Sequence, residues 1–254
     1  MFLIAGPCAI ENRDITLTTA EALKRIAQDM HIELYFKSSF DKANRTSVNG
    51  IRGMGLNAGI QAFADIKSKL NIPCITDVHE PYQCPVAAQV IDILQIPAFL
   101  CRQTDLLVAA AKTGKVVNVK KGQFMSPEAM RFAVEKVRAA GNEQVLITER
   151  GTTFGYTDLV VDFRGVKELK RNACPVVFDA THSLQQPNQA KGVTGGRPDL
   201  IETMAKAAVA VGFDGLFMET HPEPAKALSD GANMLPLNQL HDLLVKLVRI
   251  RKAI

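Results

Sequence analysis

Four residues of the types that bind divalent metal ions stand at or just beyond the ends of short apolar runs. Cys8 follows FLIAGP, His182 follows VVFDAT, Glu219 follows GLFM, and Asp230 lies in ALSDGAN. A thiolate, an imidazole and two carboxylates suit Zn, Fe or Mn, and this mixed set leaves the identity of the ion open. A single cysteine at the end of a strand is usually a small packing residue. Four such residues at one rim would instead favour a metal site, so their placement by the fold decides between the two interpretations.

A second group consists of basic residues that stand near the ends of other apolar runs. Its members are Lys37, Lys42, Arg45, Arg102, Lys120 and Arg150. Most of the 30 Lys and Arg residues are expected to be solvated, but a buried cation is costly unless an anion meets it. Arginine offers a two-pronged donor to phosphate, and lysine offers a point charge. Cations of both types at one mouth therefore predict a substrate that carries two phosphates and a carboxylate.

Strand and helix signals alternate along the whole chain. The predicted strands lie near 2–8, 32–38, 73–78, 92–97, 115–120, 144–149, 174–181 and 214–219. The predicted helices lie near 16–30, 57–70, 83–90, 104–113, 127–140, 165–172, 199–212 and 236–252. In SPEAM, Ser126 suits a helix cap and Pro127 suits the first helical position. Nearly continuous apolar strands and eight such units without a linker predict one (β/α)8 barrel domain over residues 1–254, with a doubly wound open sheet as the alternative.

A closed barrel would bring the candidate residues together. The carboxyl ends of the strands form the active face of such barrels. The first, seventh and eighth strands are then neighbours, which would put Cys8, His182 and Glu219 side by side. Asp77 and His79 end the third strand and are candidates for proton transfer or for support of the metal ligands. The ordinary alternative for Asp77 is a carboxylate bonded to nearby backbone.

The composition narrows the kinds of partner. The chain has 254 residues, of which 47% are hydrophobic and 22% charged, and its net charge is +4. No run of Lys and Arg exceeds two residues, which argues against a nucleic-acid or membrane surface. No stretch approaches the roughly 18 apolar residues of a spanning helix, and the start MFLIAGPC lacks the basic region of a signal peptide. Five scattered cysteines without CxxC spacing favour reduced thiols and a cytoplasmic location.

Nine segments of the chain, taken in order, carry a family likeness. They are AGPCAIE, FKSSFDKANRTS, TDVHE, QIPAFLCRQTDLL, NVKKGQF, TERGTTFGY, FDATHS, GLFMETHPEP and ALSDGANMLPL. Together they cover essentially the full chain, and they resemble the 3-deoxy-D-manno-octulosonate 8-phosphate synthase family. The resemblance implies a (β/α)8 barrel that forms a homotetramer and condenses phosphoenolpyruvate with D-arabinose 5-phosphate. The implied product is an eight-carbon sugar acid phosphate that feeds the inner core of lipopolysaccharide in the bacterial cytoplasm.

The resemblance also implies roles for individual residues. The family has a metal-dependent branch with Cys after the first-strand Gly-Pro and a metal-independent branch with Asn there, and Cys8 resembles the former. The implied metal ligands are Cys8, His182, Glu219 and Asp230. The implied phosphoenolpyruvate ligands are Lys37, Lys42, Gln95, Lys120 and Arg150. The implied aldose phosphate ligands are Asn44, Arg45, Thr46 and Ser47, and Arg102 is expected to reach the aldose phosphate of a neighbouring subunit.

In the implied reaction, carbon 3 of the enol attacks the aldehyde while water adds at carbon 2. The resulting hemiketal phosphate then loses phosphate by C–O cleavage. Lysines and arginines would stabilise the developing charge, and the metal would position or activate the water or the aldehyde. The residues expected to take part in catalysis are Lys42, Asp77, Lys120, Arg150 and His182.

Two other functions fit parts of the sequence. The sister enzyme, 3-deoxy-D-arabino-heptulosonate 7-phosphate synthase, uses erythrose 4-phosphate and typically reads KPRTSP where this chain reads KANRTS. A barrel without catalytic activity that binds phosphorylated ligands is the alternative from a different class. All four metal-ligand types and the set of cations are present, which argues against such a binding barrel.

Overall fold

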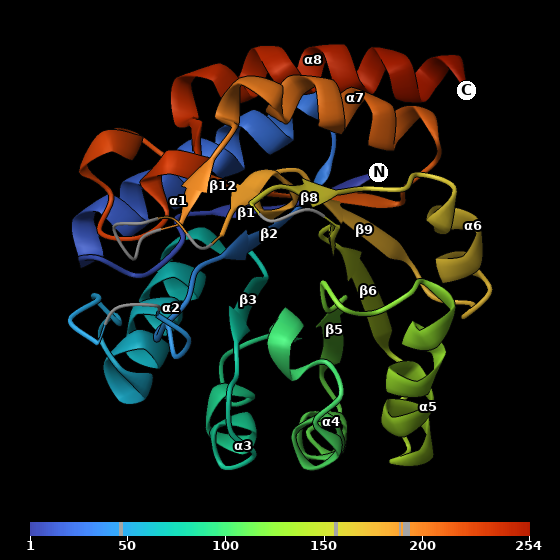
Figure 1. Cartoon of the computed structure of the whole chain (residues 1–254). Helices are drawn as coiled ribbons and strands as arrows, with labels where there is room; N and C mark the ends of the chain where they lie inside the picture. The colour runs from blue at the N-terminus through green and yellow to red at the C-terminus, as the bar shows by residue number, and fades with distance from the viewer. Residues whose placement is uncertain (46–47, 155–156, 188, 190–193) are drawn as a thin grey trace.

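The computed structural model describes residues 1–45, 48–154, 157–187, 189 and 194–254 (Figure 1). Eight parallel strands of these described residues form a closed barrel, because the first strand pairs with both the second and the last of them. In order they are β1 (Phe2–Gly6), β2 (Glu33–Lys37), β3 (Cys74–Asp77), β4 (Ile93–Ile96), β5 (Val116–Lys120), β6 (Val145–Glu149), β9 (Val176–Asp179) and β12 (Gly215–His221). The predicted (β/α)8 barrel is confirmed, and its closure excludes the doubly wound open sheet.

In the described part of the chain, eight α-helices surround the barrel on its outside (Figure 1). They are α1 (Arg13–Met30), α2 (Leu56–Leu70), α3 (Gln83–Ala87), α4 (Thr104–Lys112), α5 (Arg131–Ala139), α6 (Gly165–Lys170), α7 (Ile201–Ala210) and α8 (Leu237–Ala253). Each overlaps a helix predicted from the sequence. The Ser126 hydroxyl accepts a hydrogen bond from the Ala129 N–H at 3.2 Å, so the predicted cap is present, although it begins a 3₁₀ turn (Glu128–Met130) that leads into α5.

The described loop residues also form five two-residue strands, which the sequence does not predict. β7 (Thr152–Thr153) pairs with β8 (Leu159–Val160), and β10 (Gln185–Gln186) pairs with β11 (Gly195–Gly196), both in antiparallel fashion. β13 (Leu235–Pro236) adds to β12 in parallel. Strands this short show no alternation of apolar and polar residues, which is why the pattern of the sequence misses them.

The barrel interior contains an apolar layer with a polar layer above it. The apolar layer is one cluster of Ile4, Ile75, Ile93, Leu146, Val177 and Phe217. Successive side chains of a strand point to opposite faces, so the residue two positions further along also points inward. In five of these strands the next inward position is polar and buried, and the residues there are Asp77, Gln95, Thr148, Asp179 and Glu219. Polar groups therefore collect inside the barrel toward the carboxyl ends of its strands.

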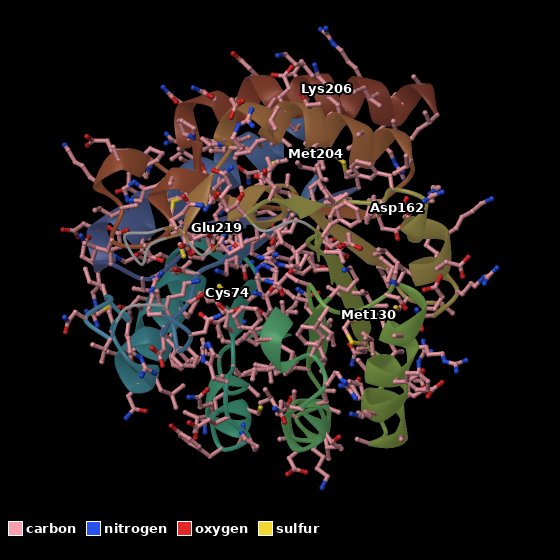
Figure 2. All side chains as sticks on the ribbon, viewed as in Figure 1. Cys74, Met130, Asp162, Met204, Lys206 and Glu219 are labelled. Atoms are coloured by element: carbon pink, nitrogen blue, oxygen red, sulfur yellow. The ribbon has the colours of Figure 1, made fainter. Side chains whose placement is uncertain are left out.

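A larger apolar cluster packs the outside of the strands against the helices. Figure 2 shows the resulting contrast between Glu219 in the middle of the molecule and Lys206 on the outer surface of α7. The Glu219 side chain is 1% exposed and the Lys206 side chain is 40% exposed. Among the described helices, none combines the length and apolar character needed to cross a membrane.

Candidate active site

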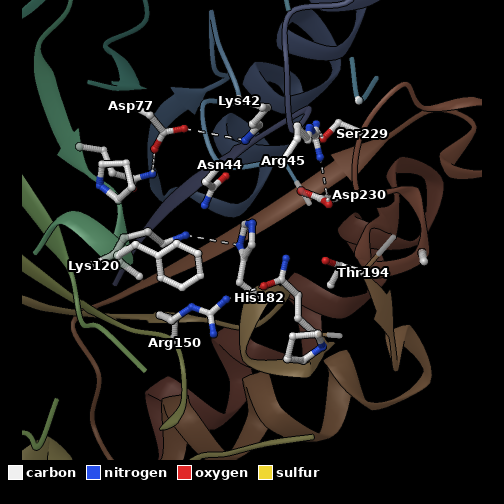
Figure 3. A pocket seen from close by; sticks show the side chains of 18 of the residues that line it. Lys42, Asn44, Arg45, Asp77, Lys120, Arg150, His182, Thr194, Ser229 and Asp230 are labelled. Carbon is white, nitrogen blue, oxygen red and sulfur yellow. Dashed lines mark hydrogen bonds and ion pairs between the residues drawn. The ribbon is translucent and has the colours of Figure 1, made fainter. Parts of the chain in front are cut away.

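A cavity of about 620 Å³ opens at the carboxyl ends of the barrel strands (Figure 3). This volume lies within the range of about 300–1,000 Å³ that is typical of small-molecule sites. The described lining includes five Lys and Arg residues but two Asp residues. These are Lys37, Lys42, Arg45, Lys120 and Arg150, with Asp77 and Asp230. The excess of positive charge favours an anionic ligand.

Two lysines from β2 and the loop after it lie on one side of the cavity. Lys37 is 1% exposed and donates to Glu219 Oε1 at 2.9 Å and to the Cys8 carbonyl oxygen at 3.2 Å. Lys42 Nζ lies 3.8 Å from both Asp77 Oδ2 and Glu219 Oε1. Burial opposes the negative charge of these carboxylates, but the lysines hold the pKa of Asp77 and the pKa of Glu219 well below their ordinary values. Both carboxylates are therefore ionised at neutral pH.

The glycine in AGPC allows this close arrangement. A Cβ atom at Gly6 would lie 1.9 Å from the backbone oxygen of Lys37, so only glycine fits between β1 and β2. Gly6 also pairs in register with Glu219 of β12. The end of β1 thus brings Cys8 next to the functional ends of both neighbouring strands.

Polar side chains form a continuous network across the floor of the cavity. Thr148 Oγ1 donates to Asn118 Oδ1 at 2.7 Å, and Asn118 Nδ2 donates to Gln95 Oε1 at 2.8 Å. Gln95 Nε2 and Ser39 Oγ donate to the two carboxylate oxygens of Asp77. The described partners of Asp77 are side chains, so the expectation of a backbone-bonded carboxylate is wrong. The Gln95 amide accepts one hydrogen bond and donates another within this network, and it thereby positions the Asp77 carboxylate.

His182 and Lys120 meet at the carboxylate of Asp179. His182 Nδ1 lies 2.7 Å and Lys120 Nζ lies 2.5 Å from Asp179 Oδ2. Burial opposes the charge of Asp179, but His182 and Lys120 hold its pKa well below its ordinary value. Lys120 Nζ also lies 4.0 Å from the centroid of the Phe217 ring, a cation–π distance. The sequence places Asp179 at a strand end but assigns it no role.

Arg150 follows β6 and has an unused hydrogen-bond donor. Its residue is 4% exposed, and its Nη2 donates to Gln185 Oε1. Its Nη1 is buried and has no hydrogen-bond partner among the described residues. Burial lowers the pKa of Arg150, but an arginine remains protonated at physiological pH. A buried guanidinium with an N–H group that lacks an acceptor among the described residues is a suitable partner for phosphate or carboxylate.

Three of the four predicted metal ligands form a compact group. One ligand atom from each of Cys8, Glu219 and Asp230 lies within 4.8 Å of the others, and Cys8 Sγ donates to Asp230 Oδ2 at 3.1 Å. His182 Nε2 lies 3.5 Å from Glu219 Oε2, and this buried oxygen has no hydrogen-bond partner in the described structure. Burial and then the charges of Asp230 and Glu219 raise the pKa of the Cys8 thiol. The donor types and the unsatisfied carboxylate oxygen fit a divalent cation.

The loop that carries Asp230 has a distinctive backbone. Asp230 has a φ of 50°, in the left-handed region that Asp tolerates better than most residues. A Cβ atom at Gly231 would lie 2.2 Å from a backbone oxygen of the preceding turn, so glycine is required there. Ser229 Oγ lies 2.9 Å from Cys8 Sγ and accepts a hydrogen bond from Arg45 Nη2. Ser229 therefore connects the metal-ligand group to a cavity cation, a role that the sequence does not reveal.

Glu11 fastens the same loop from the other side. Its Oε1 accepts a hydrogen bond from the Leu228 N–H at 2.8 Å, and its Oε2 lies 3.6 Å from His221 Nε2. The acidic residue that closes the segment AGPCAIE thus supports the loop of Asp230.

The structure gathers most of the predicted site residues in one place. Those that line the cavity are Lys37, Lys42, Asn44, Arg45, Asp77, Gln95, Lys120, Arg150, His182 and Asp230. Cys8 and Glu219 are absent from the described lining, but they are bonded to the lining residues Asp230 and Lys37 respectively. Arg102 is exposed and is absent from the described lining, so within one chain it lies apart from the other cations. Thr46 and Ser47 lie outside the described residues.

Comparisons with known proteins give a consistent family assignment. The DAHP synthetase I family matches residues 1–254. A Koribacter versatilis protein named 2-dehydro-3-deoxyphosphooctonate aldolase is 53% identical over 257 residues, which cover 100% of this chain and 92% of the relative. Proteins of the same name from Desulfotalea psychrophila and Nitrobacter winogradskyi are 52% and 55% identical, and the matches cover 100% and 97% of this chain and 91% and 86% of the relatives. The chain therefore belongs to the DAHP synthetase I family.

Proposed function

We propose that this protein condenses phosphoenolpyruvate with D-arabinose 5-phosphate and water, giving 3-deoxy-D-manno-octulosonate 8-phosphate and inorganic phosphate. The relatives named 2-dehydro-3-deoxyphosphooctonate aldolase support the proposal, because that name denotes the same eight-carbon sugar acid phosphate. The observation that carries it is an excess of cations in one cavity, one of them with an unused buried donor, together with a group of soft and hard metal ligands whose Asp230 lines the same cavity.

We assign phosphoenolpyruvate to Lys37, Lys42, Gln95, Lys120 and Arg150. This substrate carries a phosphate and a carboxylate at the two ends of a three-carbon unit. Lys37 and Lys42 already face carboxylates, whereas Arg150 has a donor without a partner among the described residues. Arg150 therefore gains a complete new bond when the anion arrives, which makes it the largest single contributor to binding of the phosphate.

We assign one divalent ion, Zn, Fe or Mn, to Cys8, His182, Glu219 and Asp230. Two observations support this assignment. Cys8, Glu219 and Asp230 form a compact group, and His182 Nε2 lies 3.5 Å from Glu219 Oε2. When bound, such an ion supplies Lewis-acid chemistry toward the aldehyde or the attacking water. Because Cys8 follows Gly6-Pro7, we place the chain in the metal-dependent branch of the synthases.

The chain's own residues then position the reactants and stabilise charge. Arg150 and Lys120 hold the phosphate of phosphoenolpyruvate and stabilise it as the C–O bond breaks. Asp77, kept ionised by two lysines, keeps Lys42 in place beside the enol. Arg45 and Asn44 also line the cavity (Figure 3), and we assign them to the aldose phosphate. Holding carbon 3 of the enol against the aldehyde converts an encounter of two solutes into a reaction within one complex.

Arg45 and Asn44 are expected to contribute differently to aldose recognition. Arg45→Ala should lower kcat/KM by about 100-fold for both arabinose 5-phosphate and erythrose 4-phosphate, because it removes a charged donor from the phosphate they share. Asn44→Ala should lower kcat/KM about tenfold for the pentose phosphate only, because an amide can pair with a sugar hydroxyl. Steady-state kinetics with both aldoses measure the two ratios. An equal loss for both aldoses in Asn44→Ala would contradict the role assigned to its amide.

Arg102 is proposed to complete the site of a neighbouring subunit in a homotetramer. Arg102→Ala and Lys120→Ala should each be inactive alone, whereas a randomly mixed tetramer should recover competent sites, about one quarter of the total at equal ratio. Two affinity tags allow purification of the hybrids, and native mass spectrometry verifies their composition. Hybrids that are as inactive as the parents would contradict a shared site.

Release of inorganic phosphate tests the proposed function. Metal-loaded protein is expected to release phosphate from phosphoenolpyruvate when arabinose 5-phosphate is present and to release none without an aldose. No release with any aldose phosphate would favour the barrel that only binds phosphorylated ligands. All five cysteines are free thiols in the structure, which supports placing this reaction in the bacterial cytoplasm, where its product would enter lipopolysaccharide synthesis.

A further inference from the structure

Asp179 is the most heavily used carboxylate of the cavity region. It ends β9 and is 0% exposed. Its Oδ1 accepts hydrogen bonds from Thr181 Oγ1 at 2.9 Å and from the backbone N–H groups of Thr181 at 3.1 Å and His182 at 2.8 Å. Its Oδ2 faces His182 Nδ1 at 2.7 Å and Lys120 Nζ at 2.5 Å. Both oxygens of Asp179 therefore meet donors only.

This arrangement fixes the orientation of His182. An ionised carboxylate only accepts hydrogen bonds, so the proton of the neutral imidazole is assigned to Nδ1. The lone pair then lies on Nε2, which is the nitrogen 3.5 Å from the unsatisfied Glu219 Oε2. A carboxylate behind a histidine in this way orients the ring and raises its basicity toward a metal ion.

The same oxygen of Asp179 also fixes Lys120. The Lys120 side chain is 8% exposed and is held between Asp179 and the face of the Phe217 ring, 4.0 Å away. Figure 3 shows Lys120 reaching toward His182, and the Nζ to Nδ1 contact of 3.4 Å is drawn between them. One carboxylate thus positions Lys120 at the end of β5 and His182 in the 3₁₀ turn after β9.

We propose that Asp179 is a positioning residue that holds the metal ligand His182 and the phosphoenolpyruvate ligand Lys120 at once, so that both half-sites depend on it. This inference rests on the proposed function for the identity of the two ligands. It assigns to Asp179 no contact with substrate or metal. Its consequence is that a single change at a residue outside both half-sites weakens both of them.

Asp179→Asn tests this dependence with little change of shape. An amide has one accepting end, and because both ends of Asp179 face donors, its NH₂ group must oppose donors whichever way it turns. Substrate-free Asp179→Asn is expected to bind Zn²⁺ about 10–100-fold more weakly in competition with a chromogenic chelator. Metal-free Asp179→Asn is expected to bind phosphoenolpyruvate about tenfold more weakly by calorimetry, since a misplaced Lys120 loses a charged hydrogen bond.

Asp214→Asn is the matched control. Asp214 accepts hydrogen bonds from Lys170 Nζ at 3.0 Å and from the Val176 N–H at 2.9 Å, at the start of β9 rather than at its end, so both affinities should stay within about threefold of the original. If Asp179→Asn lost only one of the two affinities, or neither, the inference would be overturned. An unmodified protein that bound neither Zn²⁺ nor phosphoenolpyruvate would instead overturn the proposed function.

A second measurement does not depend on the folding of a variant. Proton-detected NMR of the unmodified, metal-free protein labelled with ¹⁵N-histidine reports which ring nitrogen of His182 carries the proton, and His182→Gln assigns the signal. We expect the proton on Nδ1. A ring without a proton on Nδ1 would show that Asp179 does not orient it, and would overturn the inference.

Discussion

Replacement of Cys8 by alanine is expected to abolish tight binding of a divalent ion and to lower kcat by about 10³-fold, or about 4 kcal/mol. Cys8 Sγ lies within 4.8 Å of ligand atoms of Glu219 and Asp230, and it is the one soft ligand of the proposed set. Without the thiolate, the ion would be held by two carboxylates and one imidazole, and this ligand set binds Zn²⁺ or Fe²⁺ more weakly. Metal content of the purified variant and its turnover in added Zn²⁺, Mn²⁺ or Fe²⁺ measure the effect.

Cys74→Ala is the control for the loss of a buried thiol. Cys74 lies in β3, donates weakly to the Ile72 backbone oxygen and does not belong to the group of metal ligands. This variant should keep its metal and its turnover. Cys8→Asn should also lose the metal but retain more activity than Cys8→Ala, because the metal-independent branch of the synthases that this chain resembles carries Asn at this position. Full activity of chelator-treated Cys8→Ala protein would contradict a catalytic metal.

Arg150→Ala is expected to lower kcat/KM for phosphoenolpyruvate by about 10²–10³-fold, the usual effect of removing one preorganised donor from developing charge. The reason is that Arg150 Nη1 is buried and has no partner among the described residues, so the anion supplies its missing bond. Arg150→Lys keeps the charge but loses the two-pronged geometry, and we expect an intermediate effect. Steady-state kinetics with phosphoenolpyruvate as the varied substrate give the size of each loss.

Arg164→Ala is the matched control for Arg150→Ala. The Arg164 side chain is 91% exposed and pairs with Asp162 at the surface. Its removal should change kcat/KM by less than about twofold, because exposed ion pairs contribute little. If Arg150→Ala retained the kinetics of the unmodified protein, the phosphate would have to bind elsewhere in the cavity.

The fold and the residues at the rim of the site were predictable because one sequence pattern marks both: an apolar strand whose last inward-facing residue is polar. Ile75 lies in the apolar layer of the barrel and Asp77, two positions later, lies in the polar layer. Val177 and Asp179 repeat this relation in β9, and Phe217 and Glu219 repeat it in β12. An apolar run that ends in an ionisable residue therefore predicts both that a strand is present and that the ionisable side chain points into the barrel.

The pairing of these side chains was not predictable from the same pattern. Lys37 bonds to Glu219 across 182 positions of sequence, and Cys8 bonds to Ser229 across 221 positions. Such contacts depend on the register between strands and on the path of the loops, which residue types do not encode locally. For this reason the sequence assigned no role to Asp179 or Ser229.

The most direct test of the proposed condensation is a competition between aldoses in one reaction. Phosphoenolpyruvate is supplied in limiting amount with equal concentrations of arabinose 5-phosphate and erythrose 4-phosphate, and mass spectrometry measures the ratio of eight-carbon to seven-carbon sugar acid phosphates. That ratio equals the ratio of the two kcat/KM values. The account predicts an excess of the eight-carbon product of about 100-fold, since the hydroxyl-binding groups of the site would be unpaired with the shorter sugar. A predominant seven-carbon product would contradict it and identify the sister synthase.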